Sequence, residues 1–343
     1  MSATRTRSAN MPAPAGVAGP ACMRWSPGRV QSWRRPEDGG FDPARYGVAP
    51  IGYTDAREFC LEVHYAGTYP ADRQRYGLFD LSGGERLVGV AVLSVPTRPE
   101  VLTAVFPQLV PYEESLDLGR FCLLDEPCPA NSESWFLGQV FRLAATTGIT
   151  GLTSFSDPMP RYDIDGNLYK PGHMGLIYQA SNSRYTGRAT PRTLVMLRTG
   201  EVLSDRALQK VRGQERGHEY VERLLIAHGA RAARAGENPA AWLRQALQDA
   251  RVLRVRHRGN HRYAFTLGRN RRERAAVKVA IPGRAYPKIP DPGPQMELDL
   301  FSASDAARPQ RPGAQARRAP ACKQWPLQSS QGDPPLRKGT RND

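Results

Sequence analysis

The stretch SLDLGRFCLLDEPCPANSESWFLGQVFRLAATTGITGLTSFSDP, residues 115–158, decides the fold. Its first part, 115–124, places apolar side chains at alternate positions, which is typical of a strand with one buried face. Residues 131–147 predict a helix, with Asn131 or Ser132 as its N-cap and Gly148 as its stop. Residues 149–156 predict a second strand. Strand, helix and strand in this order form a βαβ unit, which on its own is more often structural than functional.

The segments around this unit extend it into a larger sheet. Residues 55–65 predict a short helix, and the continuous apolar run 87–95 is typical of a strand that is covered on both faces. A further helix is expected at 175–182 and a last strand at 193–198. Strands interleaved with helices indicate an α/β fold, a mixed sheet flanked by helices, over residues 46–200.

Past residue 200 the pattern changes to helices at 205–212, 215–228 and 239–250. Residues 252–257 and 262–267 then alternate on either side of a Gly-Asn turn, which predicts a β-hairpin. We therefore expect a basic helix–hairpin extension over 201–280. The Pro-, Gly- and Ala-rich segment 1–45 and the Pro-rich segment 281–343 predict disordered arms.

The positive charge lies almost entirely in the second half of the chain. Residues 1–200 hold 20 basic and 19 acidic side chains, whereas residues 201–343 hold 28 and 14, out of a net charge of +15. A charge concentrated in this way favours an anionic polymer, above all a nucleic acid, as the partner. The plain alternative is a GC-rich genome, which enriches arginine without any function.

Composition also excludes several classes of protein. A hydrophobic content of 40% over 343 residues can build a core, so a wholly disordered chain is excluded. No apolar run is long enough to cross a membrane, and the N-terminus lacks the apolar region of a secretion signal. The five cysteines form no C-x-x-C pair, which argues against a disulfide framework or a structural zinc site. We expect a cytoplasmic protein in a bacterial host.

Five motifs, in order and at consistent spacings, give the chain a family resemblance. They are His64-Tyr65, the LGR of 118–120, the NSESWFLGQVFR helix of 131–142, the SFSD of 154–157 and GLIYQASNSRYTGR at 175–188. Together they resemble the Mom family over roughly residues 50–200. These are phage DNA-modification proteins with a fold related to the GNAT acyltransferases. The resemblance implies transfer of a carbamoylmethyl (acetamido) group to N6 of adenine in DNA, which protects phage DNA from host restriction.

The resemblance implies catalytic roles for Tyr65, Arg120, Asp157 and Tyr178, with His64 beside them. Asp157, at a strand end, could accept the proton that N6 loses, although it could equally cap a turn before Pro158. Arg120 would need an anionic partner if buried, such as a phosphate, a carboxylate or Asp157 itself. Tyr178 lies where GNAT relatives place a tyrosine that protonates a leaving thiolate. His64 is either a metal or substrate ligand or a structural histidine.

The cofactor follows less clearly from the residues. The N-terminus of the helix at Asn131, Ser132 and Ser134 presents free N–H groups that could hold an anion such as pyrophosphate. The usual Gly-rich pyrophosphate loop of GNAT proteins is missing, however, because Asp125, Glu126 and two prolines stand in its place. An acyl-CoA-like donor and a divalent metal are both left open.

The arginine-rich stretch 251–274 is the candidate DNA-binding surface. It holds nine arginines and one acidic residue, and guanidinium groups suit phosphate contacts whose strength depends on salt. Tyr263 lies among them, where it could stack on an unpaired base or pack in the core. The alternative is an arginine-covered face in contact with solvent only. The residues that we expect to contact double-stranded DNA are Arg254, Arg256, Arg258, Arg262, Tyr263, Arg271 and Arg272.

A short motif in the C-terminal arm suggests a second partner. Leu298, Leu300 and Phe301, in the segment QMELDLF, resemble the peptides that dock into the bacterial sliding clamp. A chance match or a self-docking strand is the alternative. Two rival functions also stay open for the whole chain: a GNAT-type acyltransferase acting on a protein or small amine, and a non-catalytic DNA-binding accessory protein on the same fold.

Overall fold

A computed structural model describes residues 22–25, 31–34, 40–288 and 337–338. The clamp-like motif at Leu298, Leu300 and Phe301 lies outside the described residues. Within them, no helix is long and apolar enough to cross a membrane.

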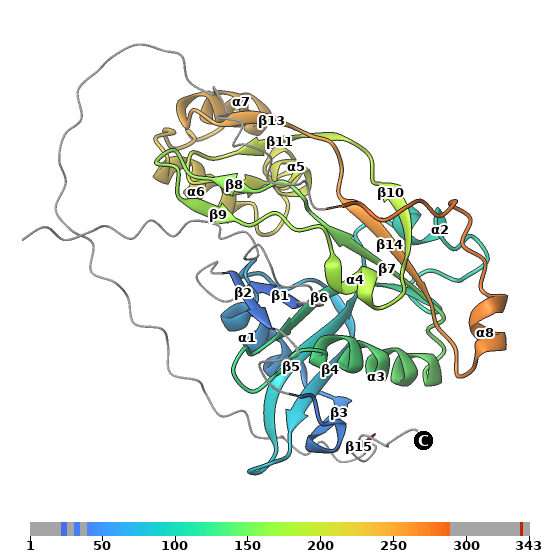
Figure 1. Cartoon of the computed structure of the whole chain (residues 1–343). Coiled ribbons are helices and arrows are strands. Elements are labelled where there is room, and N and C mark those ends of the chain that lie inside the picture. Colours follow the sequence, from blue (N-terminus) through green and yellow to red (C-terminus); the bar gives the residue numbers. More distant parts are fainter. Residues whose placement is uncertain (1–21, 26–30, 35–39, 289–336, 339–343) are drawn as a thin grey trace, which may run out of the picture.

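The central element is an eight-stranded mixed sheet (Figure 1). All neighbouring strands pair antiparallel except β6 and β7, which are parallel. In spatial order the strands are β10 (Arg184–Arg188), β14 (His261–Thr266), β7 (Gly151–Ser156), β6 (Ser115–Leu123), β5 (Arg86–Ser94), β4 (Asp72–Asp80), β3 (Tyr46–Pro50) and β15 (Arg337–Lys338). The expected mixed α/β sheet flanked by helices is therefore confirmed.

Helices cover both faces of this sheet. Helix α1 (Tyr53–Val63) packs Phe59 and Cys60 against Leu87 and Val90 of β5. Helix α3 (Ser132–Thr146) packs its apolar stripe into the larger core on the other face, which includes Val88 and Leu93 of the same strand. The expectation that 87–95 is a strand buried on both faces is thus correct. The remaining helices beside the sheet are short: η2 (Pro43–Arg45), α2 (Glu100–Thr103), α4 (Leu176–Ala180) and α8 (Arg271–Ala276).

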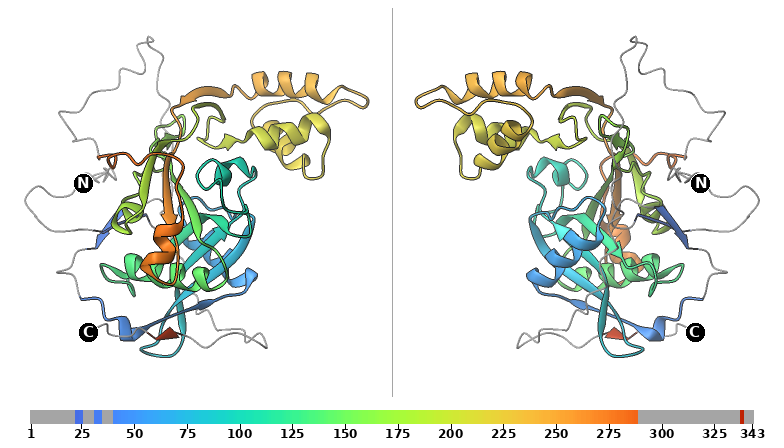
Figure 2. Two further views of the ribbon diagram at one scale, coloured as in Figure 1. Left: turned by 90° about the vertical axis from the view of Figure 1, so that its right-hand side faces the viewer. Right: turned by 90° about the vertical axis from the view of Figure 1, so that its left-hand side faces the viewer.

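A second unit, residues 189–260, is inserted between β10 and β14 (Figures 1 and 2). This inserted module has its own core, in which Trp242, Leu208 and Leu225 are buried, and it projects to one side of the sheet in Figure 2. Its elements are β11 (Arg192–Met196), β12 (Val202–Leu203), α5 (Asp205–Gly213), α6 (Glu219–Ala227), α7 (Pro239–Asp249) and β13 (Leu253–His257). The three helices predicted past residue 200 are all present.

The predicted hairpin at 252–267 is wrong. Strand β13 pairs with β11 in a three-stranded sheet of the module, whereas β14 returns to the main sheet and lies between β7 and β10. The segment therefore joins two units, because the turn at Gly259 leads from one sheet to another. It follows that the module is an insertion into the main domain and not an extension after residue 200.

The arms are also shorter than expected. Strands β1 (Cys22–Trp25) and β2 (Gln31–Arg34) pair antiparallel within the segment 1–45 that was predicted to be disordered. At the other end, residues 281–288 continue the folded body: Ile281 packs beside Val105 and Phe106, and the Arg284 N–H donates to the Tyr185 carbonyl over 2.8 Å. A last hairpin, β8 (Arg161–Tyr162) with β9 (Leu168–Lys170), lies between the main sheet and the module.

Candidate functional site

The parallel strands β6 and β7 stop pairing in the middle of the sheet. Their register runs from Ser115–Gly151 to Asp117–Thr153, after which β6 stays paired with β5 and β7 with β14. The Asp117 side chain lies at the point of separation and accepts a hydrogen bond from Thr153 Oγ1 over 3.0 Å. Polar groups concentrated where two parallel strands separate make this the centre of the candidate site.

Asp117 is one of two site residues that the sequence analysis did not predict; the other is His257. Burial raises the pKa of its carboxyl to about 7, with the hydrogen bond from Thr153 and the charge of Arg120 acting in the opposite direction. A carboxylate with a pKa near the working pH is well matched to general-base catalysis. In the sequence, Asp117 looks like an outward-facing polar position of an alternating strand. Its place next to the SFSD strand is a property of the sheet order.

Arg120 lies three residues further along β6 in the same region, and no carboxylate of the described residues pairs with it. Its guanidinium donates to the Thr68 carbonyl over 2.8 Å, to Thr68 Oγ1 over 2.6 Å and to the Gly119 carbonyl. Asp157, one of the partners that the sequence left open for Arg120, pairs instead with Arg161, Lys170 and His257. The positive charge is therefore held in place by neutral oxygens and can attract an electron-rich group of a substrate.

Asp157 is buried, with 5% of its surface exposed, and both of its oxygens are engaged. Oδ1 accepts from His257 Nε2 over 2.9 Å and from the Met159 N–H over 3.1 Å, while Oδ2 pairs with Arg161 at 2.5 Å and lies 3.6 Å from Lys170 Nζ. Burial alone would raise the pKa of Asp157, but Lys170, Arg161 and the His257 hydrogen bond hold it below its ordinary value. A carboxylate in this setting is a weak base and a strong anchor for its neighbours.

His257 brings the inserted module into the site. It is the last residue of β13 and is 1% exposed. Its Nδ1 accepts the Gly259 N–H over 3.0 Å, so the other ring nitrogen, Nε2, carries the proton that is donated to Asp157. This contact ties β13 of the module to the end of β7.

Tyr65 and His64 end helix α1 beside this network. The Tyr65 hydroxyl lies 3.0 Å from His173 Nε2, and Lys170 Nζ lies 5.9 Å from the centre of the Tyr65 ring. Burial lowers the pKa of His173 to about 4 and raises that of Tyr65, so both are neutral near pH 7. Burial, followed by the charge of Arg120, also lowers the pKa of His64 well below its usual value. The structure thus places Tyr65, His64 and Asp157 in one region.

Tyr178, on α4, completes the group from the opposite side. Its ring packs against Tyr263 at 5.3 Å between centroids, and burial raises the pKa of its hydroxyl, opposed by a hydrogen bond with Ser154. The charges of Asp117 and Arg120 also act on this pKa, which places all three groups in one electrostatic environment. A neutral tyrosine hydroxyl in such a place can donate a proton to a leaving group.

The N-terminus of α3 is already filled by protein groups. The Ser132 and Ser134 hydroxyls donate to the carbonyls of Pro129 and Asn131, and Asn131 itself has a left-handed backbone (φ 73°) without a capping side chain. Arg24 of β1 pairs with Glu133 and donates to the Cys128 carbonyl over 2.6 Å. The Arg24 guanidinium therefore lies beside the first turn of α3, bound to a carbonyl of the preceding loop and to the Glu133 carboxylate. The cofactor-binding roles predicted for Asn131, Ser132 and Ser134 have no support in this arrangement.

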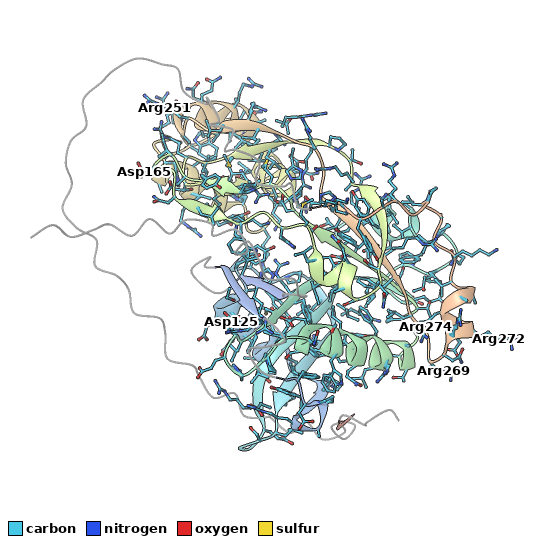
Figure 3. The ribbon with its side chains drawn as sticks, viewed as in Figure 1. Asp125, Asp165, Arg251, Arg269, Arg272 and Arg274 are labelled. Atoms are coloured by element: carbon cyan, nitrogen blue, oxygen red, sulfur yellow. The ribbon has the colours of Figure 1, made fainter. Side chains whose placement is uncertain are left out.

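The predicted DNA-binding residues lie on different parts of the molecule. Arg254, Arg256 and Arg258 are exposed on or beside β13, whereas Arg271 and Arg272 are exposed on α8; Figure 3 shows Arg251 and Arg272 at opposite ends. Arg262 is half-buried in the main sheet. Tyr263 has no exposed surface and donates to the Met174 carbonyl, so it packs in the core and cannot stack on a base in this conformation.

No group of three or more His, Cys, Asp or Glu side chains in the described part of the chain could hold a metal ion. His64 Nδ1 accepts the Ala66 N–H over 3.1 Å. The described residues therefore give His64 no partners for the metal-ligand role left open from the sequence.

Three solved structures are similar to this chain at low identity. One assigned as a phosphinothricin N-acetyltransferase is 12% identical (TM-score 0.25), with 44% of this chain and 86% of that one covered. A tandem GNAT protein from the clavulanic acid biosynthesis pathway is 12% identical (TM-score 0.30), with 68% of this chain and 72% of that one covered. Malonyl-CoA decarboxylase from Agrobacterium vitis is 14% identical (TM-score 0.28), with 70% of this chain and 66% of that one covered. TM-scores this low carry no argument about function.

The comparison by family is stronger than the comparison by structure. The search of curated proteins finds no match. The model of the Mom protein family, in contrast, matches residues 45–288. That range covers seven of the eight strands of the main sheet, all except β15, together with the inserted module between β10 and β14 and the segment that follows α8. A match over more than half of the chain assigns it plainly: this protein belongs to the Mom protein family.

Proposed function

We propose that this protein modifies DNA by transferring a carbamoylmethyl group to the exocyclic N6 of adenine, so that the DNA resists restriction. The observation that carries the proposal is the family match, which runs without a break through both the polar site at β6 and β7 and the basic inserted module. The module holds 14 Lys and Arg against 7 Asp and Glu. A transferase-like site joined to a positively charged unit suits a nucleic-acid substrate.

The proposed chemistry divides among three groups. N6 of adenine is a poor nucleophile because its lone pair is delocalised into the ring, so a base must remove its proton as the new C–N bond forms. We assign that base to Asp117, whose pKa of about 7 suits the task. Arg120 stabilises electron density on the oxygen of the incoming group, and the neutral Tyr178 hydroxyl supplies a proton to the leaving group as its bond to carbon breaks.

Asp157 and Tyr65 have supporting roles in this scheme. The Asp157 carboxylate holds Arg161, Lys170 and His257 in one buried network, and the Tyr65–His173 pair borders it. The network therefore positions β8, β9 and the module around the reacting groups. This assignment revises the general-base role that the sequence suggested for Asp157.

Arg24 at the N-terminus of α3 disfavours the rival acyl-CoA function. A pyrophosphate at such a helix needs access to its free N–H groups, but here Arg24 of β1 packs against the first turn and Ser132 and Glu133 are buried. We therefore expect the donor to bind elsewhere, without a phosphate at this helix.

Restriction protection tests the proposal directly. Plasmid DNA from bacteria that express the protein should resist restriction enzymes whose recognition sites contain the modified adenine context. It should remain fully sensitive to enzymes whose sites contain only G and C. Complete digestion by a broad panel of adenine-containing enzymes, from cells with folded protein, would contradict it and would favour a non-catalytic DNA-binding accessory protein.

A further inference from the structure

Three segments that are distant in sequence meet at the edge of the main sheet next to the inserted module. Strand β10 is the outermost strand, β14 is its neighbour in the sheet, and residues 283–286 run along the outer edge of β10. The Arg284 N–H donates to the Tyr185 carbonyl over 2.8 Å, and the Tyr286 hydroxyl donates to the Ser183 carbonyl. These two hydrogen bonds hold residues 283–286 against the outer edge of β10.

The edge collects arginines and holds no acidic residue. Residues 183–190, 258–266 and 281–288 contain no Asp or Glu, and their basic side chains include Arg184, Arg188, Arg262 and Arg284, which we call the edge arginines. None of the described ion pairs involves an edge arginine, in contrast to Arg161, Arg206 and Arg231, which each pair with a carboxylate. Three of the four are exposed, and Arg262 is half-buried.

Neutral oxygens and backbone hold these guanidinium groups in place. Arg262 Nε donates to Thr186 Oγ1 over 2.9 Å, and Arg188 Nη1 donates to the Gly259 carbonyl over 3.3 Å. Arg284 lies across Gly187, where a Cβ would come within 3.3 Å of its guanidinium carbon. Burial and the charge of Arg284 both lower the pKa of Arg262. Like charges gathered without a counterion repel one another, and a bound anion would relieve that repulsion.

We propose that the edge arginines bind the phosphate backbone of double-stranded DNA. They form a band that continues, through the turn at Gly259, into the exposed Arg258, Arg256 and Arg254 of β13. The band extends over two sheets and stays open, which fits a repeating chain of phosphates better than a single small anion. This inference rests on the proposed function for its choice of DNA, and it adds a surface on the catalytic domain itself.

Duplex binding, measured by fluorescence anisotropy against salt concentration, tests the band. The variant combines Arg184→Gln, Arg188→Gln and Arg284→Gln, all at exposed positions. The matched control removes the same charge with Arg98→Gln, Arg206→Gln and Arg231→Gln, which are paired with glutamates. The plot of log K against log salt has a negative slope. Its magnitude should decrease by roughly 0.9 for each phosphate that is no longer neutralised, thus by roughly 2–3 in all, in the band variant and not in the control.

Two further measurements keep the outcome decisive. An unchanged thermal midpoint shows that the band variant is folded, and the corresponding Arg→Lys variant should recover most of the slope because the charges remain. An equal fall of the slope in band variant and control, or no fall in either, overturns the inference. The result is independent of the restriction assay: a wild-type protein that binds DNA through the band but protects nothing would refute only the proposed function.

Discussion

Asp117 carries the most specific chemistry of any single residue here. With its pKa near 7, it changes protonation in the physiological range, where an ordinary aspartate does not. We expect Asp117→Asn to lower the rate of DNA modification by about 10²–10⁴-fold, as loss of a general base does. Wild-type activity should rise with pH to a plateau above pH 7, and the residual activity of Asp117→Asn should lack this rise. A pH–rate profile of both proteins checks this, and an unaltered profile in the variant would exclude Asp117 as the base.

The same group affects stability with a definite sign. Because folding raises the pKa of Asp117, its contribution to stability is complete below about pH 4 and is lost as pH rises through about 7. Asp117→Asn should therefore unfold with less pH dependence between pH 4 and 8 than the wild type. Chemical denaturation at several pH values measures the difference, and parallel curves for the two proteins would contradict the assignment.

Asp157 should affect stability with the opposite pH dependence, because folding lowers its pKa. Its substitution by Asn leaves Arg161, Lys170 and His257 without their shared carboxylate, so we expect a loss of about 3–5 kcal/mol in the free energy of unfolding at pH 7. Because folding lowers its pKa, the wild-type protein should lose this stabilisation as pH falls below about 4. The exposed Asp165→Asn is the control and should change little. A stable but inactive Asp157→Asn protein would instead restore Asp157 as the base.

At the scale of the elements, the turn between β13 and β14 couples the module to the site. Gly259 has φ of 92°, and a Cβ there would come within 1.9 Å of the Ala189 carbonyl oxygen. We expect Gly259→Ala to cost at least about 1–3 kcal/mol of stability, because it combines backbone strain with a clash and shifts the N–H that orients His257. Gly83→Ala, with nothing within 4 Å, is the control. Urea denaturation compares them; equal stability would show that the turn can move freely.

The sequence predicts elements whose signal is local and misses those defined by distant partners. Helix α3 and strand β5 follow from capping and continuous apolarity, and both are correct. The predicted strands 252–257 and 262–267 correspond closely to β13 and β14, but alternation does not specify the partner, so the predicted hairpin is wrong. Strand β10, RYTGR, has no apolar pattern and depends on its neighbours.

The candidate site divides in the same way. The resemblance identified Tyr65, Asp157 and Tyr178, which the fold brings into one region. His257 and Asp117 were missed because their place in the site comes from burial and from contacts with residues that are distant in the sequence. His257 contacts Asp157, 100 residues away, and Asp117 contacts Thr153, 36 residues away. Tyr263, in contrast, could have been assigned to the core from its alternation with Phe265 and Leu267 in an apolar strand.

For the whole molecule, the inserted module and the main sheet should hold DNA together. Arg254 and Arg256 lie on β13, an outer strand of the module sheet, and Arg258 follows it, next to His257, which binds Asp157. Replacing all three by Gln should weaken duplex binding and reduce its salt slope by roughly 2–3, with little preference between DNA sequences. Replacement of Arg271 and Arg272 on the distant α8 gives a comparison. A salt slope that responds only to the α8 pair would place the DNA at the end of the molecule opposite the module.

The mass of the deoxyadenosine recovered from plasmid DNA tests the central claim most directly. The plasmid is isolated from bacteria that express the wild type or Asp117→Asn at equal levels, digested to nucleosides and measured by mass spectrometry. We predict a new nucleoside, heavier than deoxyadenosine by one carbamoylmethyl substituent, in the wild-type sample and a strongly reduced amount in the variant. Unmodified deoxyadenosine in both samples, from folded protein that binds DNA, would contradict the claim.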